Sequence, residues 1–238
     1  MVNDVTPPIV LAMTGASGAA YAVRLLDVLV AAGVEVHLSI SPAGQAVLKQ
    51  ELDLDVDLAS VSLSDLVPSA DAYRDDRRFA SLRELLGDAA LATHGHPTTK
   101  NYELRTKNVQ YHYHHHQNLF APIASGSFLT AGMVVCPCSG GTLSGIAHGT
   151  SANLIQRAAD VHLKERRRLI LVPRETPLST IMLDNMRRAA EAGAVVLPAM
   201  PGWYHGVRTL RDLVDFVVGR VCDQLGVRNA LVKRWGAE

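Results

Sequence analysis

The amino-acid sequence predicts an α/β protein: a Rossmann-like, open, doubly wound parallel sheet in a single domain that carries one insertion. Short apolar runs alternate along the chain with segments of helical spacing, which is typical of strand–helix units in a parallel sheet. Clusters of glycine, serine and charged residues follow these runs, as they do where such sheets bind ligands. The 238 residues, of which 48% are apolar, suffice for one domain with a sizeable core.

The first third of the chain predicts two strand–helix units. Residues 8–13 form a short apolar run that stops at T-G-A-S-G, and residues 19–33 show helical spacing up to Gly33. Residues 34–41 then read as a second strand and residues 43–52 as a second helix. A chain that begins in this βαβα order favours a parallel sheet covered by helices.

Similar units return in the second half of the chain. We expect strands at residues 132–139, 168–175 and 194–201, one or two helices at 139–165, and single helices at 179–193 and 209–226. The run at 132–139 is apolar without alternation, as expected of a strand that is buried on both faces.

The segment from about residue 53 to residue 117 breaks this rhythm and is interpreted as an insertion on the scaffold of the single domain, residues 1–238. It contains acidic runs, one expected helix around residues 81–91 and a polar, histidine-rich tail. The tail holds His112, His114, His115 and His116, with His94 and His96 upstream. Such histidines bind a metal or make surface and subunit contacts; we assign no metal ligand.

Charge and cysteine content exclude several functional classes. Lys plus Arg and Asp plus Glu both number 23, so no long-range field favours nucleic acid or an anionic membrane. The N-terminus lacks the basic residues of a signal peptide, and no apolar stretch approaches the ~20 residues of a membrane helix. Three cysteines make no disulfide framework, which favours the reducing cytoplasm.

Three polar clusters follow predicted strands and define a candidate site. They are Gly15-Ala16-Ser17-Gly18, then Ser41 after the second strand, then Ser139-Gly140-Gly141-Thr142 after a buried strand. Glycines permit close backbone approach, and a following helix N-terminus offers amides to an anion. The alternatives are a tight turn with Ser17 as helix cap and a plain cap at Ser41.

Cys136 and Cys138 are interpreted as packed thiols, because C-x-C alone is a poor zinc motif.

Charged residues and aromatics follow the later strands. Arg157 and Lys164 are seven residues apart, on one helix face, and Arg174 and Glu175 follow the next strand. Cations with one carboxylate suit a phosphate that is bound and exchanges a proton. The segment P-G-W-Y-H follows the last predicted strand; its aromatics are either core or a surface that stabilises an allylic cation.

Four strings resemble the flavin prenyltransferase, or UbiX-like, family: MTGASGA, GSFLTAGMVVCPCSGGTLSGIAHGT, NLIQRAADVHLKERRRLILVPRETPLSTIMLDNM and PAMPGWYHGVRTLRDLVDFVVGR. The resemblance covers residues 8–52 and 119–236 with the motifs in order. It implies a flavoprotein fold that uses reduced FMN, in a homo-oligomer, often a dodecamer, with active sites between subunits.

The resemblance also implies roles for individual residues. The implied flavin contacts are Gly15, Ala16, Ser17, Ser41, Ser139, Gly140, Gly141, Thr142 and Arg174. The implied contacts of the donor, dimethylallyl phosphate, are Lys164, Glu175, Tyr204 and Arg220, to which we add Arg157; Trp235 matches the family's C-terminal aromatic. Ser17, Glu51, Lys164 and Glu175 are the expected catalytic residues. The implied reaction joins the allyl carbon to N5 of the reduced flavin and closes a ring onto C6, without metal, for use by a UbiD-like decarboxylase.

Two rival functions remain at this point. One is a non-catalytic flavin-binding accessory subunit of a hydroxyarylic acid decarboxylase. The other is a flavoenzyme similar to phosphopantothenoylcysteine decarboxylase, echoed by S-A-N at Ser151 and P-A-M at Pro198. Pro201 stands where that family has an asparagine, and a mere flavin carrier needs no second phosphate site.

Overall fold

The computed structural model describes residues 7–68, 73, 75–87, 110–234 and 236 of the chain. Its centre is a sheet in which all pairings between neighbouring strands are parallel, in the order β3-β2-β1-β4-β5-β6. The strands are β1 Ile9–Met13, β2 Val36–Ile40, β3 Tyr111–Tyr113, β4 Gly132–Cys138, β5 Leu169–Pro173 and β6 Val195–Val196. This order reverses direction between β1 and β4, the point at which doubly wound sheets open a ligand crevice.

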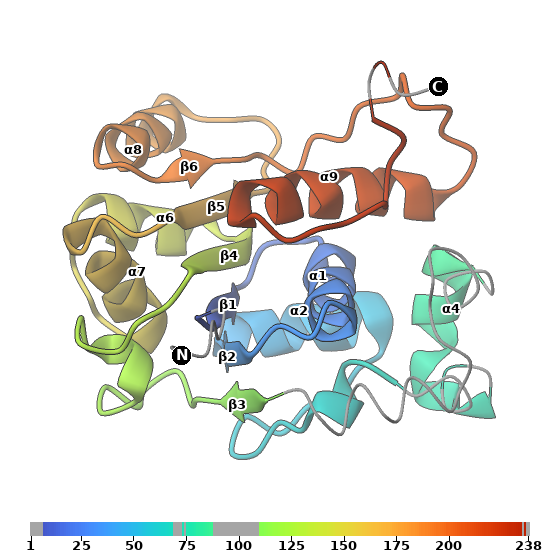
Figure 1. Cartoon of the computed structure of the whole chain (residues 1–238), viewed down its shortest axis with the longest axis horizontal. Coiled ribbons are helices and arrows are strands. Elements are labelled where there is room, and N and C mark those ends of the chain that lie inside the picture. The colour runs from blue at the N-terminus through green and yellow to red at the C-terminus, as the bar shows by residue number, and fades with distance from the viewer. Residues whose placement is uncertain (1–6, 69–72, 74, 88–109, 235, 237–238) are drawn as a thin grey trace, which may run out of the picture.

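Helices cover both faces of the sheet, so the molecule has three layers (Figure 1). The α-helices of the described part are α1 Ala19–Ala31, α2 Pro42–Leu52, α4 Ala80–Leu86, α6 Gly140–Ala147, α7 Leu154–Lys164, α8 Thr180–Glu191 and α9 Leu210–Leu225. In Figure 1, α1, α2, α4 and α9 lie on one side of the sheet and α6, α7 and α8 on the other. Short 3-10 turns occupy Leu63–Asp65, Arg77–Phe79 and Pro122–Ala124.

Each face of the sheet contributes to its own hydrophobic core. Because side chains alternate along a strand, Ile9, Leu11 and Met13 of β1 join the core under α1, α2 and α9. Val10 and Ala12 join the core under α6, α7 and α8. All residues of β1, β2, β4 and β5 are buried, as expected of parallel strands covered on both faces.

A buried ion pair joins α1 to α9. Arg24, whose side chain is 2% exposed, donates from Nε to Asp215 Oδ1 at 2.7 Å, and Arg211 Nε donates to the other oxygen of Asp215 at 3.1 Å. Buried charges are tolerated only when they are paired and hydrogen-bonded. This network therefore fixes the position of α1 relative to α9.

The predicted fold class is confirmed, with differences in detail. The segment at residues 139–165 forms two helices, and β6 is shorter than expected. The segment that the sequence analysis treated as lacking strand–helix rhythm contributes β3, which pairs with β2. The sequence Tyr-His-Tyr did not indicate a strand, because it lacks a continuous apolar run. An edge strand such as β3 needs less apolar surface than a central one. None of the helices in the described part of the chain is long and apolar enough to cross a membrane.

Candidate functional site

The ends of β1 and β4 are tied together at the point where the strand order reverses. The Thr14 hydroxyl donates to the Pro137 carbonyl oxygen at 2.7 Å and accepts from the Ser139 amide at 2.9 Å. Thr14 is 1% exposed, so these bonds lie in the interior. Thr14 was not among the residues predicted for the site. Its position could have indicated a role, because it places a hydroxyl between a buried strand and Gly15. Thr14 therefore fixes the first and third polar clusters relative to each other.

The first cluster is a turn pressed closely against α2. A Cβ added to Gly15 would lie 2.3 Å from the Cβ of Ala43. Gly18 has φ of 114°, a conformation that favours glycine, and is the N-terminal cap of α1 without a side-chain cap. The alternative reading, in which Ser17 caps this helix, is therefore wrong.

Glu51 of α2 caps α1 instead. Its carboxylate accepts from the Gly18 amide at 2.9 Å and from the Ala19 amide at 2.8 Å. These amides were expected to be available to an anion, but they are already hydrogen-bonded to this carboxylate from the neighbouring helix. The contact nevertheless brings Glu51 next to Ser17, as its predicted catalytic role requires.

Arg174 brings the end of β5 to the same turn. Its Nε donates to the Ser17 carbonyl oxygen at 3.2 Å. Tyr21, one turn into α1, lies close enough for the Arg174 charge to act on its phenol; burial nevertheless raises the pKa of Tyr21. Glu175 is exposed and accepts from the Thr176 amide at 3.1 Å. Arg174 and Glu175 therefore both lie at the carboxyl end of β5, with the guanidinium next to the turn.

Ser41 and Ser139 are helix caps, which confirms the plain alternative for Ser41. The Ser41 hydroxyl accepts from the Gly44 amide at 3.0 Å, and the Ser139 hydroxyl accepts from the Thr142 amide at 3.3 Å. The amides of Gly140 and Gly141 come before the capped one and have no acceptor within the helix. A Cβ added to Gly141 would meet nothing within 4 Å, so this backbone is open to approach.

Sheet register places this helix start beside Arg174. Cys138 of β4 pairs with Pro173 of β5, so the residues that follow them, Ser139 and Arg174, leave the sheet side by side. Two open amides, two hydroxyls and a guanidinium suit a phosphate-bearing ligand. Together with the close turn at Gly15, this donor set fits FMN.

The thiols of Cys136 and Cys138 take no part in this donor set. Both are free and buried, and burial raises the pKa of Cys138 to about 12 and that of Cys136 further. They are packed, protonated side chains, as predicted.

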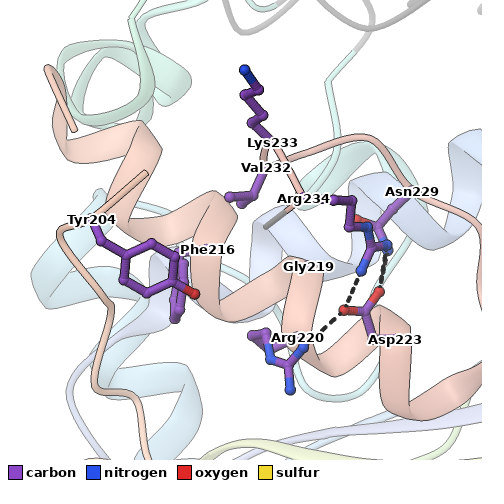
Figure 2. A pocket seen from close by; sticks show the side chains of 9 residues that line it. All are labelled: Tyr204, Phe216, Gly219, Arg220, Asp223, Asn229, Val232, Lys233 and Arg234. Carbon is purple, nitrogen blue, oxygen red and sulfur yellow. Dashed lines mark hydrogen bonds and ion pairs between the residues drawn. The ribbon is translucent and has the colours of Figure 1, made fainter. Parts of the chain in front are cut away.

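A second cluster lies on the outer side of α9 (Figure 2). Tyr204 and Arg220 line one pocket of about 120 Å³, with Phe216 on the side of the tyrosine. Asp223 accepts from Arg220 at 3.2 Å and from both terminal nitrogens of Arg234 at 2.7 Å. The bonds from Arg234 lower the pKa of Asp223.

This pocket carries a net positive charge. Arg220, Lys233 and Arg234 line it together with a single carboxylate, Asp223. Tyr204 and Arg220 were expected from the sequence, whereas the basic pair Lys233 and Arg234 was missed. Trp235 itself lies outside the described residues. Tyr204 is 66% exposed, so it is not a core residue of the chain.

The remaining predicted residues lie elsewhere in the chain. Arg157 donates to the Ala124 carbonyl oxygen at 3.2 Å and pairs with Asp160. Lys164 is the last residue of α7 and pairs with Glu165 at 2.5 Å. Because α7 ends just before β5 begins, Lys164 lies near the amino end of that strand, whereas Arg174 and Glu175 follow its carboxyl end. The expected cationic group of Lys164 with Arg174 and Glu175 does not form within this chain.

The class of protein follows from a family match. The family model described as Flavoprotein matches residues 2–222, nearly the whole chain. The curated relatives are more specific. The flavin prenyltransferase UbiX of Pseudomonas aeruginosa is 44% identical over 97% of this chain and 94% of its own. The enzyme of the same name from Halalkalibacterium halodurans is 42% identical over 95% and 92%. The chain therefore belongs to the UbiX-like flavin prenyltransferase family of flavoproteins.

Solved structures of the family share the fold. AnUbiX (PadA1), crystallised in complex with FMN and dimethylallyl pyrophosphate, superposes with a TM-score of 0.73 at 34% identity, covering 98% of this chain and 99% of its own. A dodecameric FMN-dependent UbiX-like decarboxylase from Escherichia coli O157:H7 gives 0.70 at 33% identity, covering 97% and 100%.

Proposed function

We propose that this chain transfers the dimethylallyl group of dimethylallyl phosphate to reduced FMN. Membership of the flavin prenyltransferase family carries this proposal and agrees with the enzyme class and FMN cofactor predicted from the sequence. The bound dimethylallyl pyrophosphate of AnUbiX supports a dimethylallyl donor. Reduced FMN supplies the two nucleophilic atoms, N5 and C6, to which the five-carbon unit becomes attached. The residues of the chain bind both partners and move protons.

The flavin side of the site lies at the carboxyl ends of β1, β2, β4 and β5. We assign the flavin phosphate to the open amides of Gly140 and Gly141, the hydroxyls of Ser139 and Thr142, and Arg174.

The turn at Gly15, Ala16 and Ser17, with Ser41 next to it, forms the wall against which the flavin lies. Glu51 holds this turn through the α1 amides and, with Ser17, removes the proton from the carbon at which the ring closes.

The donor side consists of Tyr204 and Arg220 in their cationic pocket (Figure 2). Arg220 neutralises the leaving phosphate, and the ring of Tyr204 stabilises positive charge on the allyl group. Lys164 and Arg157 add cationic charge, and Glu175 exchanges a proton with the phosphate. Trp235, which lies outside the described residues, is proposed as a further donor contact on the resemblance alone.

The two sides are proposed to meet between subunits. Within one chain, Arg220 and Tyr204 line a pocket on the outer side of α9, and Lys164 lies at the opposite end of β5 from Glu175. A homo-oligomer, as in the dodecameric relative, brings surfaces of different copies together. We propose a dodecamer in which the donor side of one subunit faces the flavin side of another. The product would serve a UbiD-like decarboxylase in the cytoplasm, which the three free cysteines favour.

Mass analysis of the flavin tests the reaction. The purified protein is incubated anaerobically with reduced FMN and dimethylallyl phosphate, and the extracted flavin should gain one C5H8 unit. Tightly bound but unmodified FMN would instead support the accessory-subunit function. Glu175→Gln should leave FMN bound and abolish prenylation, whereas equal turnover in this variant would remove Glu175 from the mechanism.

Complementation tests the shared site. Arg174→Ala disables the flavin side and Arg220→Ala the donor side, and each variant alone should be inactive. Co-expressed chains that mix at random should regain activity in about a quarter of the sites, because a site between subunits then receives two intact sides. No recovery in demonstrably mixed oligomers would place each site within a single chain.

A further inference from the structure

Glu35, His37 and His112 converge at the edge of the sheet, away from the proposed flavin site. Glu35 directly precedes β2, and its carboxylate lies 3.1 Å from Nε2 of His37, the second residue of that strand. His112 of β3 is the direct register partner of His37. The three side chains are therefore brought together by strand pairing, and the outer strand supplies one of them. Four residue steps of ~3.3 Å separate His37 from Ser41, which follows β2, so His37 lies about 13 Å along the chain from that residue.

The nitrogen and oxygen atoms face one another at the spacing of metal ligands. His37 Nε2 lies 3.1 Å and His112 Nε2 3.3 Å from the same carboxylate oxygen, Oε1 of Glu35. Tetrahedral zinc with bonds of ~2.0–2.1 Å holds its ligand atoms about 3.3 Å apart. Among the residues that the structure describes, this is the group of His, Cys, Asp or Glu side chains whose ligand atoms all lie within 4.8 Å of one another.

A third histidine, His114, contacts His37. His37 Nδ1 lies 2.8 Å from His114 Nε2. If a metal ion binds Nε2 of His37, the ring proton lies on Nδ1 and is donated to His114; without an ion, Nε2–H can instead donate to the Glu35 carboxylate. Metal-binding histidines characteristically donate their other ring N–H to such a partner. The His37 side chain is 5% exposed and Phe128 lies against its ring, which holds the imidazole in place.

We propose that Glu35, His37 and His112 bind a divalent transition-metal ion, with zinc the best match to two imidazoles and a carboxylate. His112 is 45% exposed, so the ion is accessible and a fourth position is left for water. The ion would fasten β3, an edge strand of three residues, to β2. No step of the proposed prenyl transfer uses this site.

Zinc binding to the untagged full-length chain tests the proposal. Zn²⁺ is titrated in competition with a chromophoric chelator, and the wild type should bind about one equivalent per chain. His112→Ala, an exposed substitution, should weaken binding at least ~10-fold, and Glu35→Gln should weaken it as well. The matched control is His148→Ala, which removes an exposed histidine from the end of α6 and should bind as the wild type does.

Cobalt spectra and thermal unfolding supply a second readout. Co²⁺ bound by the wild type should give visible absorption of a four-coordinate ion, and Zn²⁺ should raise the unfolding temperature of the wild type but not of His112→Ala. The proposal is overturned if no saturable site exists, if His112→Ala binds zinc as tightly as the wild type, or if His148→Ala loses the same affinity, which would indicate general histidine binding. Circular dichroism checks that each variant is folded.

Discussion

Arg174 at the end of β5 donates a hydrogen bond to the carbonyl oxygen of Ser17, 157 residues earlier in the chain. The bond holds a cation at the β1–α1 turn while the register of β4 and β5 places the same residue beside Ser139. One side chain therefore links the two halves of the doubly wound sheet at the proposed flavin site.

Arg174→Ala should weaken FMN binding by roughly 10- to 100-fold, because a charge-assisted hydrogen bond contributes about 1.5–3 kcal/mol. Arg174→Lys should recover only part of the affinity, since an ammonium lacks the planar fork of the guanidinium. Quenching of FMN fluorescence on titration measures both. Arg188→Ala, which removes an exposed arginine from α8, is the control; unchanged FMN affinity in Arg174→Ala would contradict the assignment.

Glu51→Ala should lower the free energy of unfolding by about 1–2 kcal/mol, because the amides of Gly18 and Ala19 lose their acceptor at the start of α1. Glu51→Gln should cost less, since its amide oxygen still accepts. Urea denaturation at one protein concentration measures the change. Glu191→Ala removes a carboxylate that is 61% exposed and should change stability by less than ~0.5 kcal/mol. Equal effects of the Glu51 and Glu191 variants would rule out this capping role.

Gly15→Ala should destabilise the protein by about 1–3 kcal/mol, because its new Cβ would lie 2.3 Å from that of Ala43. Removing the opposing methyl group in Ala43→Gly should relieve the overlap, although glycine within α2 itself costs about 1 kcal/mol. A double-mutant cycle in urea therefore predicts that the double variant is more stable than the sum of the single variants implies. If the effects of the two substitutions on stability simply add, the contact between residues 15 and 43 is not the reason why this turn requires glycine.

His162 predicts a loss of stability in mild acid. Burial lowers the pKa of His162 below its ordinary value of 6.5, and the neutral ring is bonded to the Thr130 hydroxyl at 2.8 Å and to the Ala158 carbonyl oxygen at 2.7 Å. As the pH falls below 6.5, the unfolded chain takes up a proton before the folded one, so this contribution is complete above pH 6.5 and declines toward the lowered pKa.

Urea unfolding between pH 7.5 and 5.5 measures this slope, which for one proton is at most ~1.4 kcal/mol per pH unit. His162→Gln should show a flatter dependence than the wild type. His148→Gln, at an exposed position, should keep the slope of the wild type. If His162→Gln retains the full slope, the acid sensitivity originates in other groups.

The alternation of apolar runs and helical segments was sufficient to predict the sheet, its parallel sense and most element positions. It was sufficient because buried parallel strands need continuous apolar residues, which leave a clear signal in β1, β4 and β5. β3 left no such signal. Its Tyr-His-Tyr sequence pairs only with β2, and an edge strand is held by backbone bonds that the residue pattern does not reveal.

The motifs of the candidate site could also be recognised in the sequence, but the spatial relations between them could not be predicted from it. Ser17, Ser41, Ser139 and Arg174 were expected together at the strand ends, and the structure places Arg174 against the Ser17 carbonyl oxygen and, by strand register, beside Ser139. Thr14, Lys233 and Arg234 were missed, because a single hydroxyl or a basic pair becomes informative only when its neighbours are known. Lys164 and Glu175 lie at opposite ends of β5 within one chain, since a helix that returns to the start of a strand carries its last residue away from the strand's end; their grouping stays a prediction for a site between subunits.

The sequence by itself determined the fold class and the family and predicted the candidate site residues, because these depend on local spacing and residue type. Only the tertiary structure decided where these residues lie: Arg174 and Glu51 at the β1–α1 turn, and Tyr204 and Arg220 on the outer side of α9. It also revealed the group of Glu35, His37 and His112 at the sheet edge, to which no role was assigned from the sequence. The physical reason is that contacts between residues far apart in the chain follow from strand order and register, which result from the packing of all elements together and are not encoded in any one segment.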